Sequence, residues 1–238
     1  MIKTIVPLLC IAVILSLCGA MLFYMQTSPR FEINRIGIRG HARILPETIV
    51  EALQIEPRTN IFQIQLDAVK QKLEAMQWIK SAEVYRNFPD KLSIRLVERV
   101  PFALVKVDKL YLVDVDGVVL GALASGSAIR LPIITGSFVK QILLNGDNPE
   151  LAQAFHTLNT LLNSSHPLFH HIRKIQIESP ENVILFSDDS LPQIWLSLLS
   201  IQQGMERLER IYPELTVEQI ASIDLRFQKR IIVTPNKS

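Results

Sequence analysis

Few of the polar residues have a spacing that could support catalysis. Ser137-Phe138-Val139-Lys140 has the Ser-x-x-Lys spacing of penicilloyl-serine enzymes, in which the serine is the nucleophile. Neither the Ser-Asp-Asn nor the Lys-Thr-Gly motif of those enzymes follows, and no helical pattern presents the serine. We therefore interpret this spacing as a chance match.

A histidine cluster and an acidic pair are the other candidates. His166, His170 and His171 surround Pro167, but no Cys or well-spaced carboxylate completes the four-ligand set of a zinc site. Asp188-Asp189 lies in a predicted hairpin turn, where carboxylates are usually solvated. A glycine-rich phosphate loop and a nucleophile elbow are both missing from the sequence. The sequence thus predicts no catalytic residue, no metal and no cofactor, and indicates that the protein is not an enzyme.

The strongest signal is an apolar segment near the amino terminus. No charged residue occurs from Thr4 to Pro29, and Ile5 to Met25 is almost continuously apolar. This length spans a bilayer core as a helix, with Tyr24 at the interface. We predict a transmembrane helix at 4–25, preceded by a tail at 1–3. The charge bias around the span leaves its orientation open.

A cleaved signal peptide is the competing interpretation of this segment. Lys3 would begin it, and Cys18-Gly19-Ala20 would be its small-residue cleavage site. The apolar run continues past that site through Met21, Leu22 and Phe23, beyond the usual length of a signal peptide's apolar region. A lipoprotein is disfavoured because Leu17 is bulky for the position before a lipidated cysteine. The pattern favours an uncleaved anchor.

Composition excludes some classes of protein. The chain has 238 residues, enough for two modest domains. Its 25 basic residues nearly balance its 23 acidic ones, and no run of five like charges occurs. Nucleic-acid binding therefore has no electrostatic support.

The segment after the span predicts a βααββ order. We expect a strand at 31–38, closed by Gly40, and a short helix that begins at Pro46. A helix at 66–76 and strands at 82–88 and 91–97 should follow. Pro89-Asp90 should form the turn between these strands, and Trp78 should plug the core beside them. The expected buried residues of the two strands are Ala82, Val84, Leu92, Ile94 and Leu96.

The second half of the chain is rich in predicted strands. Glu98 and Pro101 should bend the chain before it, and Asp116-Gly117 should form a hairpin turn. The stretch from Gly121 to Gly136 has the weakest pattern. Two amphipathic helices are expected, one that begins at Asn148-Pro149 with Leu151, Ala154, Phe155, Leu158 and Leu162 inward, and one at 197–212. The expected strands are 102–107, 110–114, 118–120, 172–177, 183–186, 220–227 and 230–233.

Three segments carry a family resemblance. The run from Trp78 to Ala103 resembles the carboxyl half of a POTRA domain that leads into its neighbour, as in the FtsQ/DivIB bacterial cell-division proteins. Leu112 to Val119 and Ala221 to Phe227 continue the resemblance, whereas Ser197 stands where that family usually has Gly. The resemblance implies an α+β fold: a transmembrane helix, a POTRA domain at 31–98, and a β domain at 99–235 with an extended sheet and flanking helices.

The same resemblance implies a function without catalysis. The chain would be a single-pass, type II scaffold of the inner membrane, with residues 1–3 in the cytoplasm and its folded domains in the periplasm at the division site. It would link division proteins of the FtsB/DivIC and FtsL types, and other division membrane proteins through the POTRA domain. Neither nucleic acid nor a small-molecule substrate is expected.

Partner binding is expected at the carboxyl-terminal strands, through addition of a strand from the partner. By the resemblance, Phe227 stands where that family more usually has Tyr. The positive charges of Arg226, Lys229 and Arg230 favour an acidic partner segment. The competing interpretation is a hairpin that simply closes the sheet. The expected binding residues are Asp224, Leu225, Arg226, Phe227, Gln228, Lys229 and Arg230.

Two other classes are weighed against this function. A membrane-anchored cell-wall hydrolase or transglycosylase would need a converging acid, base or nucleophile, and the sequence offers none. POTRA-bearing outer-membrane assembly proteins end in a barrel of many strands, for which the predicted helices after Pro101 leave no room.

Overall fold

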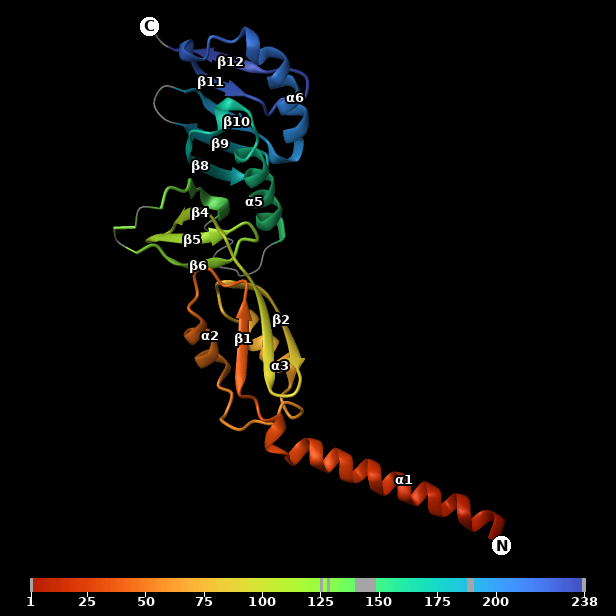
Figure 1. Ribbon diagram of the computed structural model, residues 1–238. Helices are drawn as coiled ribbons and strands as arrows, with labels where there is room; N and C mark the ends of the chain where they lie inside the picture. The colour runs from red at the N-terminus through yellow and green to blue at the C-terminus, as the bar shows by residue number, and fades with distance from the viewer. Residues whose placement is uncertain (1, 125, 128, 140–148, 188–190, 237–238) are drawn as a thin grey trace. The chain divides into compact units, whose positions relative to one another are not determined.

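The computed structural model describes residues 2–124, 126–127, 129–139, 149–187 and 191–236, with side chains from residue 9 onward (Figure 1). It divides into two compact units, Met1–Arg99 and Val100–Ser238. Arg99 therefore falls in the first unit, and each unit is described by itself below.

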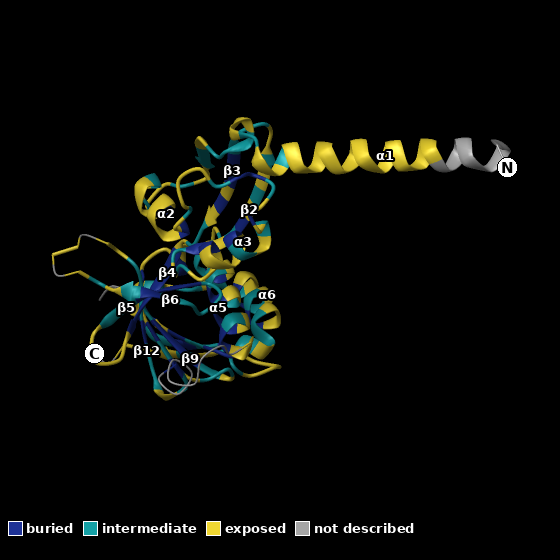
Figure 2. Cartoon of the chain, turned by 90° about the horizontal axis from the view of Figure 1, so that it is seen from below, coloured by how far each residue is buried: buried dark blue, intermediate teal, exposed yellow. Residues whose placement is uncertain are grey.

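The first unit begins with the long helix α1 (Ile2–Thr27). Within the described residues it is the one helix long and apolar enough to cross a membrane, over Leu9–Thr27. From Leu9 onward its side chains are almost all exposed (Figure 2). An exposed apolar helix of this length fits a single-pass membrane protein.

The rest of the first unit has the predicted βααββ order. Its sheet has the order β1-β3-β2, with β1 parallel to β3 and β2 antiparallel to it. The elements are β1 (Arg35–Arg39), α2 (Pro46–Leu53), α3 (Leu66–Glu74), β2 (Ile79–Asn87) and β3 (Lys91–Glu98). The turn at Pro89-Asp90 joins β2 to β3 as expected.

The first strand is shorter than predicted. Phe31 belongs to a short 3₁₀ helix, Pro29–Phe31, and β1 begins only at Arg35. The residues between them bond elsewhere, since the backbone N–H of Ile33 donates to the carbonyl of Thr59 and that of Asn34 to the carbonyl of Asp90. The alternating pattern correctly indicated extended backbone at these residues, but it could not show which backbone groups they bond to.

Both helices of the first unit contribute to its core. Leu73 of α3 and Ile49 of α2 are completely buried with the core positions of β2 and β3. Trp78 is only half-buried and lies outside this core, which corrects its prediction as a core plug. The next residue, Ile79, occupies the buried position, and the guanidinium of Arg43 lies 5.4 Å from the centre of the Trp78 ring.

Glu98 holds the loop before α2. Its carboxylate accepts hydrogen bonds from the backbone N–H groups of Ala42, Arg43 and Ile44, at 2.9–3.2 Å. Burial alone would raise the pKa of Glu98. The hydrogen bonds together lower it by more than burial raises it, so the pKa of Glu98 lies below the ordinary value. Glu98 is thus architectural, as expected, although it acts within the first unit.

The second unit is built on one nine-stranded sheet, in the order β12-β11-β10-β9-β8-β7-β4-β5-β6. Its first strands and helix are β4 (Pro101–Lys106), β5 (Leu110–Asp114), β6 (Val119–Ala122), β7 (Ile133–Thr135) and α5 (Pro149–Leu162). The later elements are β8 (Ile172–Ser179), β9 (Asn182–Ser187), β10 (Gln193–Leu196), α6 (Ile201–Ile211), β11 (Ile220–Asp224) and β12 (Ile232–Pro235).

The two helices cover the same face of this sheet. Chain segments that contain α5 and α6 connect the parallel pairs β7/β8 and β10/β11. β7 and β10 run in the same direction, and each crossover leads to the neighbouring strand on the β12 side. Because such crossovers are right-handed, both helices lie on one face of the sheet. Figure 1 shows α5 and α6 on the same side. The core lies between them and the sheet, with Phe155 and Leu208 completely buried.

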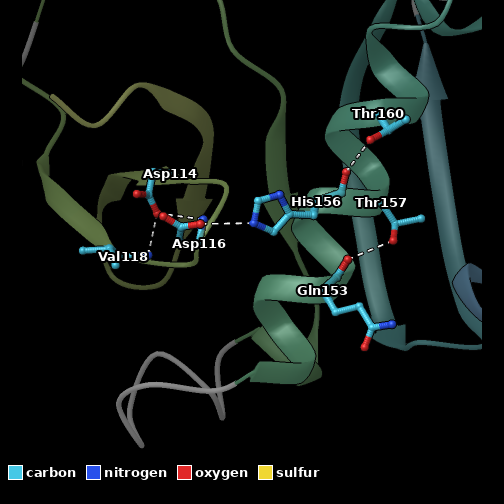
Figure 3. A network of polar contacts seen from close by, with 7 residues as sticks. All are labelled: Asp114, Asp116, Val118, Gln153, His156, Thr157 and Thr160. Carbon is cyan, nitrogen blue, oxygen red and sulfur yellow. Dashed lines mark hydrogen bonds and ion pairs between the residues drawn. The ribbon is translucent and has the colours of Figure 1, made fainter. Parts of the chain in front are cut away.

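The turn between β5 and β6 forms the predicted hairpin and reaches α5 (Figure 3). Asp114 accepts hydrogen bonds from the backbone N–H groups of Asp116 and Val118, at 3.0 and 2.8 Å. Gly117 supplies a left-handed residue, with φ of 82°. His156 of α5 lies 3.1 Å from the Asp116 carboxylate. A side-chain network therefore fixes this turn against the helix.

The sequence did not predict the strands β7 and β10, and the predicted helix at 197–212 begins earlier than α6 does. β7 has only three residues within the weakest stretch, and β10 has four, too few for a clear alternation. A 3₁₀ turn, Leu198–Ser200, precedes α6 where a continuous helix was predicted. Ser197 has extended backbone angles that any residue adopts, so its place in a usual glycine position causes no strain.

Leu73→Ala tests the core of the first unit. Removing a fully buried leucine should lower the free energy of unfolding by roughly 2–5 kcal/mol. Chemical unfolding of the detergent-solubilised chain, followed by Trp78 fluorescence in a Trp195→Phe background, reports on this unit. Val50→Ala on exposed α2 surface is the matched control. A loss below about 0.5 kcal/mol for Leu73→Ala would contradict the assigned core.

Candidate functional site: the carboxyl-terminal edge of the sheet

The carboxyl-terminal strands form an antiparallel hairpin at one end of the large sheet. Asp224 of β11 pairs with Ile232 of β12, and Ile223 pairs with Val233. Within the described residues, no strand pairs with the outer edge of β12. The predicted hairpin is therefore present, and its last strand offers backbone donors and acceptors to another chain.

A shallow hollow lies on the sheet face opposite the core. Along β10, Ile194 and Leu196 are buried in the core, whereas Gln193 and Trp195 alternate to the other face. The hollow is lined by Gln193, Trp195, Ala221, Ser222, Asp224, Arg226, Ile232 and Thr234. Five of these eight residues are polar, and one is aromatic.

Arg226 connects three strands across this hollow. Its guanidinium donates to both carboxylate oxygens of Asp224, at 2.6–3.2 Å, and to the side-chain oxygen of Asn182 in β9 at 3.0 Å. It also lies 4.6 Å from the centre of the Trp195 ring, a cation–π contact. Arg226 is thus fixed by internal partners, and its charge is largely compensated.

The ionisation of the pair follows from these contacts. Burial raises the pKa of Asp224, but the hydrogen bonds and charge of Arg226 lower it by more, so the carboxyl pKa lies below its usual value. The hydrogen bond to Asp224 raises the pKa of Arg226. Both groups are therefore charged at neutral pH.

Leu225 points away from the surface. Its side chain is completely buried in the core of the second unit, and its backbone N–H donates to the carbonyl of Trp195 at 2.7 Å. Gly204 of α6 packs directly over Leu225, since a Cβ atom on that glycine would lie 3.4 Å from it, an ordinary contact distance. Leu225 positions the site and does not offer its side chain to a partner.

The remaining expected residues lie in the exposed loop between β11 and β12. The strand ends at Asp224, earlier than predicted, because Arg226 turns back onto Asp224. Phe227 is exposed, and the guanidinium of Arg230 lies 5.1 Å from the centre of its ring. The loop residues available to a partner are Phe227, Gln228, Lys229 and Arg230.

Three residues of the site were not predicted from the sequence. Trp195 and Asn182 hold Arg226, and Arg207 of α6 donates to the carbonyls of Phe227 and Gln228 at 2.9 and 2.6 Å. The alternation in Gln193–Leu196 was the one signal that could have placed Trp195 on the outer face. The contacts of Arg207 depend on tertiary packing.

The serine of the Ser-x-x-Lys spacing has a structural partner. The Ser137 hydroxyl donates to the Glu178 carboxylate at 2.7 Å, and Lys140 lies outside the described residues. Asp188-Asp189 also lies outside them. Ser137 is thus bonded to β8, and the Ser-x-x-Lys pair as a whole lies partly outside the described residues.

The histidine cluster caps a turn. His166 Nδ1 accepts a hydrogen bond from the backbone N–H of Leu168, and the ring packs against Tyr212 and Phe169. Burial lowers the pKa of His166, so the imidazole is neutral at pH 7. His170 Nε2 lies 3.1 Å from the carbonyl of Ser164. Among the residues that the structure describes, no group of three potential ligands could hold a metal.

Trp195 fluorescence in a Trp78→Phe background tests the Asp224–Arg226 pair. Because the folded-state pKa of Asp224 is lowered, the pair should persist as the pH falls to about 4 and separate only below it, at the folded-state pKa. Separation moves the cation from the indole ring and changes its emission. Asp224→Asn should abolish this transition and cost about 1–2 kcal/mol of stability. An identical titration in that variant would contradict the assignment.

The geometry can be compared with known proteins. Residues 31–99 match the model of the FtsQ-type POTRA domain, and residues 103–226 match that of the carboxyl-terminal domain of cell division protein FtsQ/DivIB. Together these matches cover most of the chain.

Curated relatives agree. The chain is 32% identical to cell division protein FtsQ of Syntrophotalea carbinolica over 220 residues, which cover 90% of this chain and 77% of that protein. It is 28% identical to the FtsQ proteins of Anaeromyxobacter sp. (strain K), over 80% of this chain and 65% of that protein, and of Geobacter sp. (strain M21), over 84% and 75%. The chain belongs to the FtsQ/DivIB family of bacterial cell-division proteins.

Proposed function

We propose that this division protein is a non-catalytic scaffold that binds a partner chain by strand addition at the outer edge of β12. The observation that carries the proposal is the outer edge of β12, which has no neighbouring strand within the described residues and belongs to the same hairpin as the exposed Phe227–Arg230 loop. A partner strand would satisfy the edge backbone groups, and alternate side chains would give specificity.

Three features favour this edge. Ile232 and Phe227 are exposed apolar side chains beside it, so a partner could bury them. Lys229 and Arg230 add two positive charges on the exposed loop, whereas the charge of Arg226 is compensated internally. Arg207 holds the loop carbonyls, which lowers the entropic cost of ordering the loop on binding.

The chemistry of this edge suits an acidic, extended segment. We assign it to an FtsB/DivIC-type partner, accompanied by an FtsL-type protein. The POTRA domain at 31–98 would recruit further membrane proteins of the divisome, and the β domain at 99–235 would carry the strand-addition edge. Both domains would lie in the periplasm at the division site, with α1 in the inner membrane.

Intact mass tests the anchor. If α1 spans the membrane as an uncleaved type II anchor, the membrane-extracted protein should retain its amino-terminal residues. The reason is that the apolar run is longer than the apolar region of a cleaved signal peptide. A carboxyl-terminal tag should then react only from the periplasmic side. A mature start near Met21 would contradict the anchor, and a tag reached only from the cytoplasm would contradict the orientation.

Phe227→Ala tests the binding edge. Loss of this ring should weaken binding of a purified FtsB/DivIC-type ectodomain by more than about 1 kcal/mol, roughly a fivefold rise in Kd. Arg230→Glu should also weaken this binding, and the loss of affinity should be larger at low salt than at high salt. Arg226 is left intact because its loss would disturb the sheet.

Leu199→Ala is the matched control for this test. Leu199 is an exposed apolar residue of the same unit that lies outside the hairpin, so its truncation should leave binding unchanged. Circular dichroism verifies that all variants are folded. Equal affinities for the original chain, Phe227→Ala and Arg230→Glu would place the binding surface elsewhere.

A further inference from the structure

We propose that the end of the first unit next to α1 rests on the membrane, where an aromatic cluster of Tyr24, Phe31, Phe62 and Phe88 inserts Phe88 into the lipid headgroup region. The inference depends on α1 as a membrane anchor, but it is independent of strand addition at β12. The partner is the lipid interface of the bilayer that α1 crosses.

The junction between α1 and the folded part of the first unit is fastened by Asn60. This side chain is 6% exposed, and its amide nitrogen donates to the carbonyls of Met25 and Gln26 at 2.9 and 3.0 Å. Those carbonyls lie in the last turn of α1, where the helix supplies no partner. The Asn60 side-chain oxygen accepts from the backbone N–H of Phe62. The helix therefore enters the first unit without a free linker.

A continuous series of ring contacts leads from α1 to the β2–β3 turn. The Tyr24 and Phe31 ring centres lie 6.3 Å apart, those of Phe31 and Phe62 5.2 Å apart, and those of Phe62 and Phe88 5.1 Å apart. Tyr24 belongs to the final turn of the apolar helix, at the level where interfacial aromatic residues collect. The cluster therefore begins at the membrane interface.

Strand pairing places Phe88 at the same end of the domain. β1 runs parallel to β3, with Arg35 opposite Lys91, so the turn before β3 lies beside the point where the chain enters β1. Two contacts hold that turn there: the backbone N–H of Asn34 donates to the Asp90 carbonyl, and Arg35 forms an ion pair with Asp90 at 2.6 Å. The β2–β3 turn thus lies at the membrane-proximal end.

Phe88 has an exposure that the fold does not explain. Its side chain is 57% exposed at the tip of the turn and belongs to neither hydrophobic core. Phenylalanine, unlike a charged residue, is favoured among lipid headgroups and the upper acyl chains. Arg30, exposed next to Phe31, can approach anionic headgroups. This arrangement of an exposed phenyl ring and a nearby cation suits a lipid surface containing anionic lipid.

Depth-dependent fluorescence quenching tests the proposal with Phe88 in place. The full chain carries Cys10→Ser and Cys18→Ser, and Asn87→Cys is labelled with an environment-sensitive fluorophore. The protein is reconstituted in vesicles of phosphatidylethanolamine and phosphatidylglycerol that contain a lipid with a nitroxide near the headgroup. We expect strong quenching of this label, and at least a threefold reduction when Phe88→Ser is added.

Tyr85→Cys is the matched control, because Tyr85 is exposed on the same strand but farther from the turn. Its label should be quenched at least threefold less than the label at Asn87. Equal quenching at the two sites, or no effect of Phe88→Ser, would overturn the proposal. If the protein floats with vesicles and the Asn87 label is unquenched, this inference fails while the anchor stands. If it does not float, the anchor fails as well.

Discussion

A β-sheet satisfies its backbone hydrogen bonds only between neighbouring strands, and this constraint governs the second unit. The nine strands form an open sheet with β12 and β6 as its edge strands, and within the described residues no strand lies beside the outer row of backbone groups of β12. Closing the edge would require another strand from this chain or from a partner. The proposed function rests on the open edge of β12, which no strand of the described residues covers.

Side-chain contacts hold the strands and the loop beside this edge. Arg226 is held by Asp224, Asn182 and Trp195, three residues on three neighbouring strands. Arg207 fixes the following loop from the helical face. Such a preorganised surface loses little conformational entropy when a partner binds, so more of the contact energy contributes to affinity. The internal ion pair stabilises the surface that displays Phe227, and under the proposed function the exposed cations of the loop, not this pair, would attract the partner.

The first unit depends on a different junction. A transmembrane helix that ends in an unordered linker would leave the orientation of the next domain free. Here the amide of Asn60 satisfies two terminal carbonyls of α1, and the aromatic series continues from Tyr24 into the domain. The helix and the domain are therefore joined by direct contacts, and in the proposed arrangement the domain would meet the bilayer with one particular surface. This offers a physical reason for an exposed Phe88 in a turn where a polar residue would suffice.

The sequence by itself determined the elements whose information is local. The long apolar segment predicted α1, because hydrophobic length needs no tertiary partner, and the βααββ order followed from periodicity and turn residues. The face of α5 was also predicted apart from its last position, since Leu161 is buried and Leu162 only partly so. The family resemblance added the function class and the expectation that the carboxyl-terminal hairpin binds a partner.

Only the tertiary structure decided the non-local features. β7 and β10 are too short to show a period, and they are strands because the neighbouring strands supply their hydrogen bonds. The burial of Leu225 and the pairing of Arg226 separate the expected binding residues into a supporting group and an exposed loop. Asn60 and Phe88 carried no recognisable pattern, because their roles arise from contacts between segments 26 to 35 residues apart along the chain. Pairing across such separations depends on how the whole chain packs, which no local window of residues contains.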